Sequence, residues 1–307
     1  MSTRVSFLRL LSVLASLLCG TACDDSLKSV ALIEETRVLG ARVEVEADPL
    51  RGSPYPGEQA SARFFLVAPD AEPNFSYALS LCAVHPTNIG FPPCVGAAFA
   101  SATRIDPDTA ELSLDFRVPA DTDLKATPHA LARGLICPSS RLNLGPEGSP
   151  SCASGSGTEV AFEFALGGSA DSNQNPSFTA DAFSLDGQPW PEAEQLSCTG
   201  DSLPQVAAKS LHTLGFTLAD SNFEPLEQPT SVDPARETLL LSPFSTEGKL
   251  EHGFLALSAD TPPEQRRVNF SAPAVEGSEP RLVRFYFVVR DARSGEDFAQ
   301  RALCVVP

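Results

Sequence analysis

Apolar and polar residues alternate along most of this 307-residue chain, and this pattern constrains the fold more than any other feature. The clearest run is 111–118, where four apolar side chains, beginning at Leu112, alternate with polar ones. A spacing of two residues places apolar side chains on one face of a β-strand. Because no segment keeps an apolar period of 3.6 residues, the sequence argues against a helical domain and predicts an all-β fold.

Proline and glycine residues separate these runs and predict turns between short strands. The stretch 167–177 has no large apolar side chain and predicts a linker. We therefore expect two tandem β-sandwich domains, over 37–166 and 178–307, with two long loops, 85–110 and 138–158, in the first. The expected strands are 37–47, 62–68, 75–84, 111–118, 130–137 and 159–166, then 178–185, 206–218, 238–241, 253–258, 267–272, 282–290 and 298–306.

Residues 1–22 have the three parts of a secretory signal peptide. Arg4 and Arg9 supply its basic region, and small residues end it. The segment between, Leu8 to Leu18, is mostly apolar but shorter than the roughly 20 residues that a membrane span needs. The sequence therefore predicts export and cleavage of this segment.

Cys23 follows the small residues Gly20-Thr21-Ala22 in a pattern that resembles a bacterial lipobox, where the cysteine is acylated. The alternative is ordinary cleavage after Ala22, which leaves Cys23 as a free thiol. Of the eight cysteines, cleavage removes Cys19, and acylation of Cys23 leaves six that can pair. An odd thiol is a liability in an oxidising compartment, so parity favours lipid attachment at Cys23, with 23–36 as a tether.

These features predict an extracytoplasmic, outer-membrane lipoprotein of the bacterial cell envelope, with the lipid anchor as its contact with the membrane. The formal net charge of −17 keeps such a surface soluble. It also argues against a nucleic-acid partner, which requires basic patches. The expected partner is an envelope protein or a polysaccharide.

No motif for catalysis, a cofactor or a metal is found in the sequence. It has no G-x-S-x-G, no H-E-x-x-H and no phosphate-binding loop. It has no C-x-x-C spacing, and its histidines form no zinc-ligand pattern. The four histidines are His85, His129, His212 and His252.

Calcium is the better metal candidate, because Asp171, Asn173 and Asn175 offer oxygen ligands at alternate positions. A calcium loop of the EF type also needs a glycine and a glutamate, and Pro176 and Ala182 occupy those positions. A polar linker is therefore the favoured interpretation of this stretch.

Segments at the start of the first expected domain and at the end of the second resemble known proteins. They are Arg37–Pro49, Pro56-Gly57-Glu58, Phe64–Pro69 and the strand that ends at Cys82, then Arg284–Asp291 with Arg301–Val306. They resemble the first strands and the final hairpin of immunoglobulin-like domains in secreted lipoproteins of myxobacterial type. The resemblance implies tandem immunoglobulin-like or fibronectin-like sandwiches and brings no activity with it. In one departure, the single tryptophan, Trp190, lies outside the third strand, where such folds commonly bury one.

Six cysteines allow fifteen disulfide pairings. In an immunoglobulin-like order, the strands that end at Cys82 and Cys137 are antiparallel neighbours, so the two residues lie at opposite ends. They are then farther apart than the roughly 4.4–6.8 Å between Cα atoms that a disulfide needs. We therefore favour local pairs in the first domain. The expected disulfides are Cys82–Cys94, Cys137–Cys152 and Cys198–Cys304.

The leading hypothesis is a non-enzymatic lipoprotein, anchored through Cys23, that binds a partner or stabilises the envelope. The expected binding surface is the end of the first sandwich that carries 138–158 and the 69–74 turn. One alternative is a secreted hydrolase with a loop-borne site, since convergent sites escape sequence motifs. A cluster of a histidine, an acid and a serine would favour it. Another is an accessory carbohydrate-binding module, although one tryptophan and three tyrosines supply few exposed rings.

Overall fold

The computed structural model describes residues 29–69, 74–85, 90, 92–108, 111–167, 173–192, 195–200, 202–226 and 236–307. Residues 31–307 form one compact unit. The signal peptide 1–22 and Cys23 lie outside the described residues and stay predictions, as does the division into two domains at 167–177. Within the described ranges, no helix is both long enough and apolar enough to cross a membrane.

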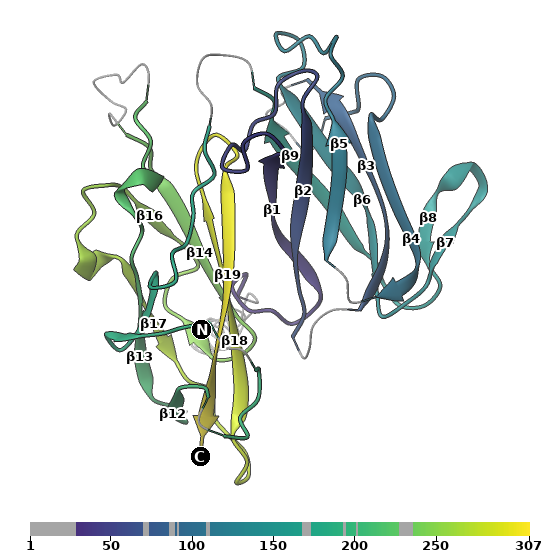
Figure 1. Ribbon diagram of the computed structural model, residues 1–307. Helices are drawn as coiled ribbons and strands as arrows, with labels where there is room; N and C mark the ends of the chain where they lie inside the picture. The colour runs from purple at the N-terminus through teal and green to yellow at the C-terminus, as the bar shows by residue number, and fades with distance from the viewer. Residues whose placement is uncertain are drawn as a thin grey trace, which may run out of the picture. The chain divides into compact units, whose positions relative to one another are not determined.

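The described chain is all-β, as predicted. The strands of its first half are β1 (Arg37–Val45), β2 (Gln59–Val67), β3 (Phe75–Val84), β4 (Ala100–Asp108), β5 (Leu112–Arg117), β6 (His129–Pro138), β7 (Leu142–Leu144), β8 (Pro150–Cys152) and β9 (Thr158–Ala165). The sheet β1-β2-β5 and the sheet β4-β3-β6-β9, which we call the first sheet pair, share one apolar core (Figure 1). Val43 and Leu114 reach this core from one sheet, and Leu81 and Ile136 reach it from the other. This layering is that of a β-sandwich.

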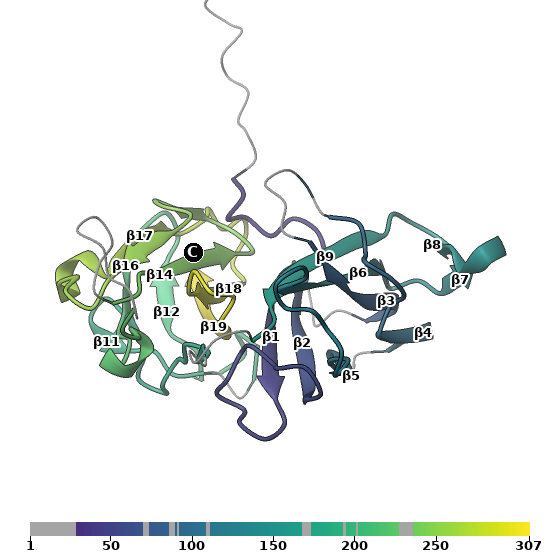
Figure 2. The ribbon, with the colours of Figure 1, turned by 90° about the horizontal axis from the view of Figure 1, so that it is seen from above.

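The two predicted loops of the first sheet pair contain strands. The second half of 85–110 is β4, an edge strand that pairs with β3. It escaped the sequence analysis because only small residues, Ala100 and Ala102, contact the core from it. The loop 138–158 contains the hairpin β7–β8, which projects from the four-stranded sheet (Figure 2). The expectation of strand-free loops is therefore wrong at both places.

The second half contains β10 (Phe183–Leu185), β11 (Gln188–Pro189), β12 (Gln205–Ala207), β13 (Leu211–Phe216), β14 (Leu239–Ser245), β15 (Lys249–Leu250), β16 (Leu255–Leu257), β17 (Arg267–Ser271), β18 (Arg281–Arg290) and β19 (Glu296–Val306). The sheets β11-β10-β13-β17-β15 and β12-β19-β18-β14-β16 form the second sheet pair. Trp190 is only 1% exposed in the core between them. Its indole Nε1 donates to Ala302 O at 3.0 Å, and its ring meets Phe285 edge-on at 5.2 Å.

Apolar and polar contacts join β1 and β2 to the β18–β19 hairpin. Phe65 on β2 stacks on Phe298 of β19, with ring centroids 4.4 Å apart. The backbone N–H of Ala41 donates to Glu296 Oε2 at 2.7 Å. Asn175 bonds to both sides, because its Nδ2 donates to Val43 O and its Oδ1 accepts from the Glu296 N–H. In the described part of the expected linker, Asn173, Asn175 and Pro176 are therefore buried, and hydrogen bonds fix Asn175 in place.

Candidate functional site

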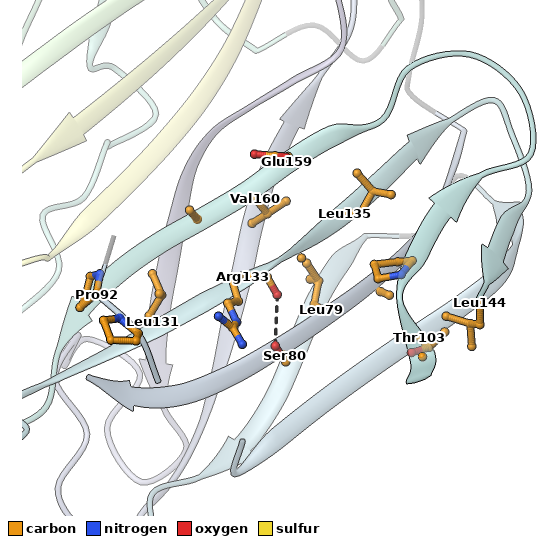
Figure 3. Close-up of a pocket in the computed structure, with 16 residues that line it drawn as sticks. Leu79, Ser80, Pro92, Thr103, Leu131, Arg133, Leu135, Leu144, Glu159 and Val160 are labelled. Carbon is orange, nitrogen blue, oxygen red and sulfur yellow. Dashed lines mark hydrogen bonds between the residues drawn. The ribbon is translucent and has the colours of Figure 1, made fainter. Parts of the chain in front are cut away.

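The outer face of the sheet β4-β3-β6-β9 carries a groove of about 830 Å³ (Figure 3). The alternation that sends Leu79 and Ile136 into the core sends their neighbours outward. On this outer face, Arg133 of β6 lies opposite Ser80 of β3 and Ala161 of β9. The small side chains on both sides of Arg133 leave the space that forms the groove.

Two disulfides hold the walls of this groove. Cys82 and Cys137 follow the outward rows of β3 and β6, so their sulfur atoms lie on the grooved face. Cys82–Cys94 fixes the segment that carries Pro92 and Pro93, which line the groove. Cys137–Cys152 fixes the β7–β8 hairpin, which contributes its own lining residue, Leu144. In Figure 3, Pro92 lies beside Leu131, and Leu144 lies on the far side of Arg133.

The third disulfide, Cys198–Cys304, joins a connection of the second sheet pair to its last strand. The three pairs favoured in the sequence analysis are thus the three disulfides of the structure. Disulfides form and persist in oxidising compartments. The chain therefore has the character of an extracellular or surface protein.

The groove offers apolar surface together with two charges of opposite sign. Arg133 and Glu159 are both exposed, and neither forms an ion pair with any residue that the structure describes. The Ser80 hydroxyl donates to the Arg133 backbone carbonyl at 3.5 Å. Among the described residues of the lining there is no histidine, cysteine or aromatic ring. This arrangement suits binding.

The groove overlaps only in part with the end of the first sandwich that was expected to bind a partner. Ser139 N donates to Asn74 O at 2.6 Å, so the 138–158 segment does lie beside the described edge of the 69–74 turn. The groove, however, extends along the face of the sheet between the two tethered walls. The groove has no sequence signature, because its floor consists of small and aliphatic outward residues that form no motif.

The geometry gives no support to the calcium site that the sequence offered. Asp171 of the calcium candidate lies outside the described residues, and Asn175 uses both amide atoms in bonds to the protein. The Nδ2 of Asn173 donates to Arg293 O at 3.2 Å. Within the described ranges, no group of three or more histidine, cysteine, aspartate or glutamate side chains could hold a metal ion.

No protein-family model and no curated protein matches the chain. Solved structures overlap with it at low similarity. Latent PorU from Porphyromonas gingivalis has a TM-score of 0.23 and 10% identity over 89% of this chain, which spans 24% of PorU. The Enterococcus faecalis adhesin ACE, which binds its ligands by the collagen hug, has a TM-score of 0.18 and 11% identity over 89% of this chain and 97% of its own. The Staphylococcus aureus collagen adhesin CNA has a TM-score of 0.15 and 8% identity, covering 90% and 96%. Similarities at these TM-scores say nothing about the function of this chain.

Proposed function

We propose that this chain is an extracytoplasmic lipoprotein of the bacterial envelope that binds a partner protein in the groove of its first sheet pair. In this proposal the two sheet pairs are tandem immunoglobulin-like sandwiches, a lipid on Cys23 anchors the chain, and resemblance to myxobacterial-type lipoproteins supports the assignment. The observation that carries the binding role is the groove between two disulfide-tethered walls. A restrained wall loses little conformational entropy when a ligand binds, which favours affinity.

The lining favours a protein segment over a polysaccharide. Leu131, Leu135 and Leu144 with three prolines supply apolar contact, and the lining residues that the structure describes include no aromatic ring on which a sugar would stack. The volume of about 830 Å³ lies within the usual size of ligand sites, roughly 300–1,000 Å³. An extended segment of an envelope protein, with aliphatic side chains and a carboxylate, matches this surface.

Arg133 would orient that segment. Its planar guanidinium can bind a carboxylate through two parallel hydrogen bonds, which a lysine cannot reproduce. Arg133 is the one positively charged side chain among the described lining residues, so a ligand carboxylate has one point of attraction in the groove. Glu159 would select a ligand with a positive or hydrogen-bond-donating group nearby.

In-cell photo-crosslinking tests the binding role. A photoreactive residue in place of Leu144 should crosslink to a defined envelope protein, identified by mass spectrometry. Arg133→Glu should reduce the crosslink about tenfold or more, since charge-assisted hydrogen bonds contribute roughly 1.5–3 kcal/mol. Arg117→Glu, on the opposite sheet, is the matched control and should leave the crosslink intact. An Arg133→Glu variant that crosslinks as well as the parent would contradict the proposed site.

The anchor is tested separately. Cys23→Ser should abolish incorporation of a labelled fatty acid and release the chain from the membrane fraction, because the lipid is its only proposed membrane contact. Continued labelling of the Cys23→Ser variant would disprove attachment at that residue.

A further inference from the structure

Ser210, His212 and Asp186 form a continuous hydrogen-bonded chain in the second sheet pair. Ser210 Oγ lies 2.6 Å from His212 Nε2, and His212 Nδ1 lies 2.7 Å from Asp186 Oδ2. This is the order of contacts in a serine–histidine–acid triad: a hydroxyl on one ring nitrogen and a carboxylate on the other. The three residues come from two separate segments, so no sequence motif could reveal them.

The fold explains how Ser210 and His212 come to lie together. The predicted strand 206–218 is interrupted, because Lys209 adopts a left-handed conformation with φ 59° between β12 and β13. From Ser210 onward every second residue points the same way, and further along this row Leu214 and Phe216 enter the core. Ser210 and His212 therefore continue the inward row to the rim of the sandwich.

A tight turn and two hydrogen bonds fix the position of Asp186. It begins the tight turn between β10 and β11, where Asp186 and Gly187 have φ of 52° and 76°. Its N–H donates to Thr213 O at 2.8 Å, and its Oδ1 accepts from the Thr213 N–H at 2.8 Å. The second oxygen, Oδ2, is thereby directed at the imidazole.

The charges favour the catalytic tautomer of His212. Partial burial opposes ionisation of Asp186, but hydrogen bonds from His212 and the Thr213 N–H outweigh it and hold the pKa of the carboxyl below its usual value. An ionised Asp186 accepts the proton on Nδ1, which leaves Nε2 of the neutral ring as an acceptor facing the Ser210 hydroxyl. The imidazole is 13% exposed and Asp186 is 50% exposed, so an acyl donor can approach from solvent.

We propose that Ser210 is the nucleophile of an acyl-transfer site that cleaves carboxylic esters, with His212 as general base and Asp186 as the positioning residue. Ser210 Oγ attacks the ester carbonyl while its proton passes to His212 Nε2. The tetrahedral intermediate collapses, the C–O bond to the leaving group breaks, and His212 returns the proton to the departing alcohol. Water then attacks the acyl-serine, with His212 again accepting a proton and returning it to Ser210.

The backbone around Ser210 limits the substrate class. The N–H groups of Ala208, Lys209 and Ser210 already donate to Val306 O, Pro273 O and Ala207 O. None of these three is therefore free to stabilise an oxyanion, a contribution of about 10²–10³ in rate. The Ser210 hydroxyl also has a competing acceptor in Ala207 O. Both facts point to esters with good leaving groups, such as aryl esters, and away from amides.

This inference goes beyond the proposed binding function and does not depend on the groove, which belongs to the first sheet pair. Its test is covalent labelling of the disulfide-intact full chain with a fluorophosphonate, in which Ser210 Oγ displaces fluoride from phosphorus. General-base assistance is worth about 10²–10⁴, so Ser210 should label roughly 100-fold faster than Ser197, whose hydroxyl instead contacts Thr199. Mass spectrometry locates the label.

Ser210→Ala should abolish the fast label and the hydrolysis of an aryl acetate, and Ser197→Ala should change neither. His212→Ala should slow labelling at least tenfold, with partial rescue by added imidazole. Asp186→Asn should also slow labelling, and Asp186→Glu should restore part of the rate. Labelling of Ser210 no faster than that of Ser197, in a chain that melts normally, would overturn the proposal. So would unchanged aryl acetate hydrolysis by Ser210→Ala.

Discussion

The two sheet pairs use the same strand alternation but are closed by disulfides of different reach. In the first pair, the bridged cysteines are 12 and 15 residues apart and lie on the outer face of one sheet. In the second, Cys198 and Cys304 are 106 residues apart, and Cys304 belongs to β19, an interior strand of its sheet. The two short disulfides restrain the walls of the groove in the first sheet pair, and the long one joins distant parts of the second.

The two cores also differ in a way that experiments can use. The single tryptophan, Trp190, packs against Phe285 and Phe287 in the second core. Tryptophan emission therefore reports the second sheet pair alone, while far-UV circular dichroism reports both. A substitution that changes only one of the two signals would show that the sheet pairs respond independently. Substitutions that always change both signals together would show that they do not.

Deletion of 298–307 should have the largest effect. It removes most of β19, which pairs with β18 along its whole length and with β12 on its other side. It also removes Leu303 and Val305 from the core and breaks the Cys198–Cys304 bridge. We expect loss of the Trp190 unfolding transition. A retained Trp190 transition with a native melting temperature would show that β19 is dispensable.

Removal of single disulfides should have the next largest effect, and the loss of stability should differ between the two sheet pairs. In the chain-entropy model a bridge over about 100 residues contributes roughly 4.7 kcal/mol and one over about 15 residues roughly 3 kcal/mol. The Cys198→Ala/Cys304→Ala variant should therefore lose more stability in urea than Cys137→Ala/Cys152→Ala, with the loss seen in Trp190 emission. Equal losses would mean that loop length does not set the contribution of these bridges.

The sequence predicted the elements whose two faces differ strongly. The 111–118 run became β5 because it alternates large apolar and polar residues. The edge strand β4 was missed because edge positions need few large side chains. The strand predicted over 206–218 was too long, since alternation does not reveal a left-handed residue such as Lys209.

The candidate sites were less predictable than the strands. Parity and topology identified the disulfides, but the groove exists only when Ser80, Arg133 and Ala161 become neighbours across three strands. The Ser210–His212–Asp186 cluster likewise requires the register of β10 against β13, which places Leu185 opposite Leu214. Register between strands is set by tertiary packing and turn geometry, which a single sequence does not display.

Gly134→Ala should destabilise the first sheet pair by about 3 kcal/mol. A Cβ at this position would lie 2.0 Å from Ala78 O, a backbone atom of β3 that cannot move without shifting the strand. Gly148→Ala, in the β7–β8 turn at φ 76° with no atom near the new Cβ, is the control for glycine loss without a clash and should cost less. Urea unfolding followed by circular dichroism measures both. An equal shift in Trp190 emission would show that the pairs unfold as one.

The smallest expected effect is an opposite response of the two pairs to pH. In the first pair, hydrogen bonding and ion pairing with Arg51, at 2.7 and 2.8 Å, hold the pKa of Glu58 below its usual value. That contribution is present above the unfolded pKa and is lost as pH falls through the lower folded value. In the second pair, burial raises the pKa of Asp291 to about 6 and that of Glu296 to about 7.

For Asp291 and Glu296 the contribution to stability depends on pH in the opposite direction. Their contribution to stability is full below the unfolded pKa values of 3.8 and 4.5 and is lost as pH rises through about 6 and 7. The Trp190 transition should therefore weaken between pH 5 and pH 8. Asp291→Asn, which keeps an oxygen for the Arg293 and Gly295 N–H groups, should flatten this dependence. A Trp190 transition that strengthens from pH 5 to pH 8 would mean that the buried acids are not what distinguishes the second sheet pair.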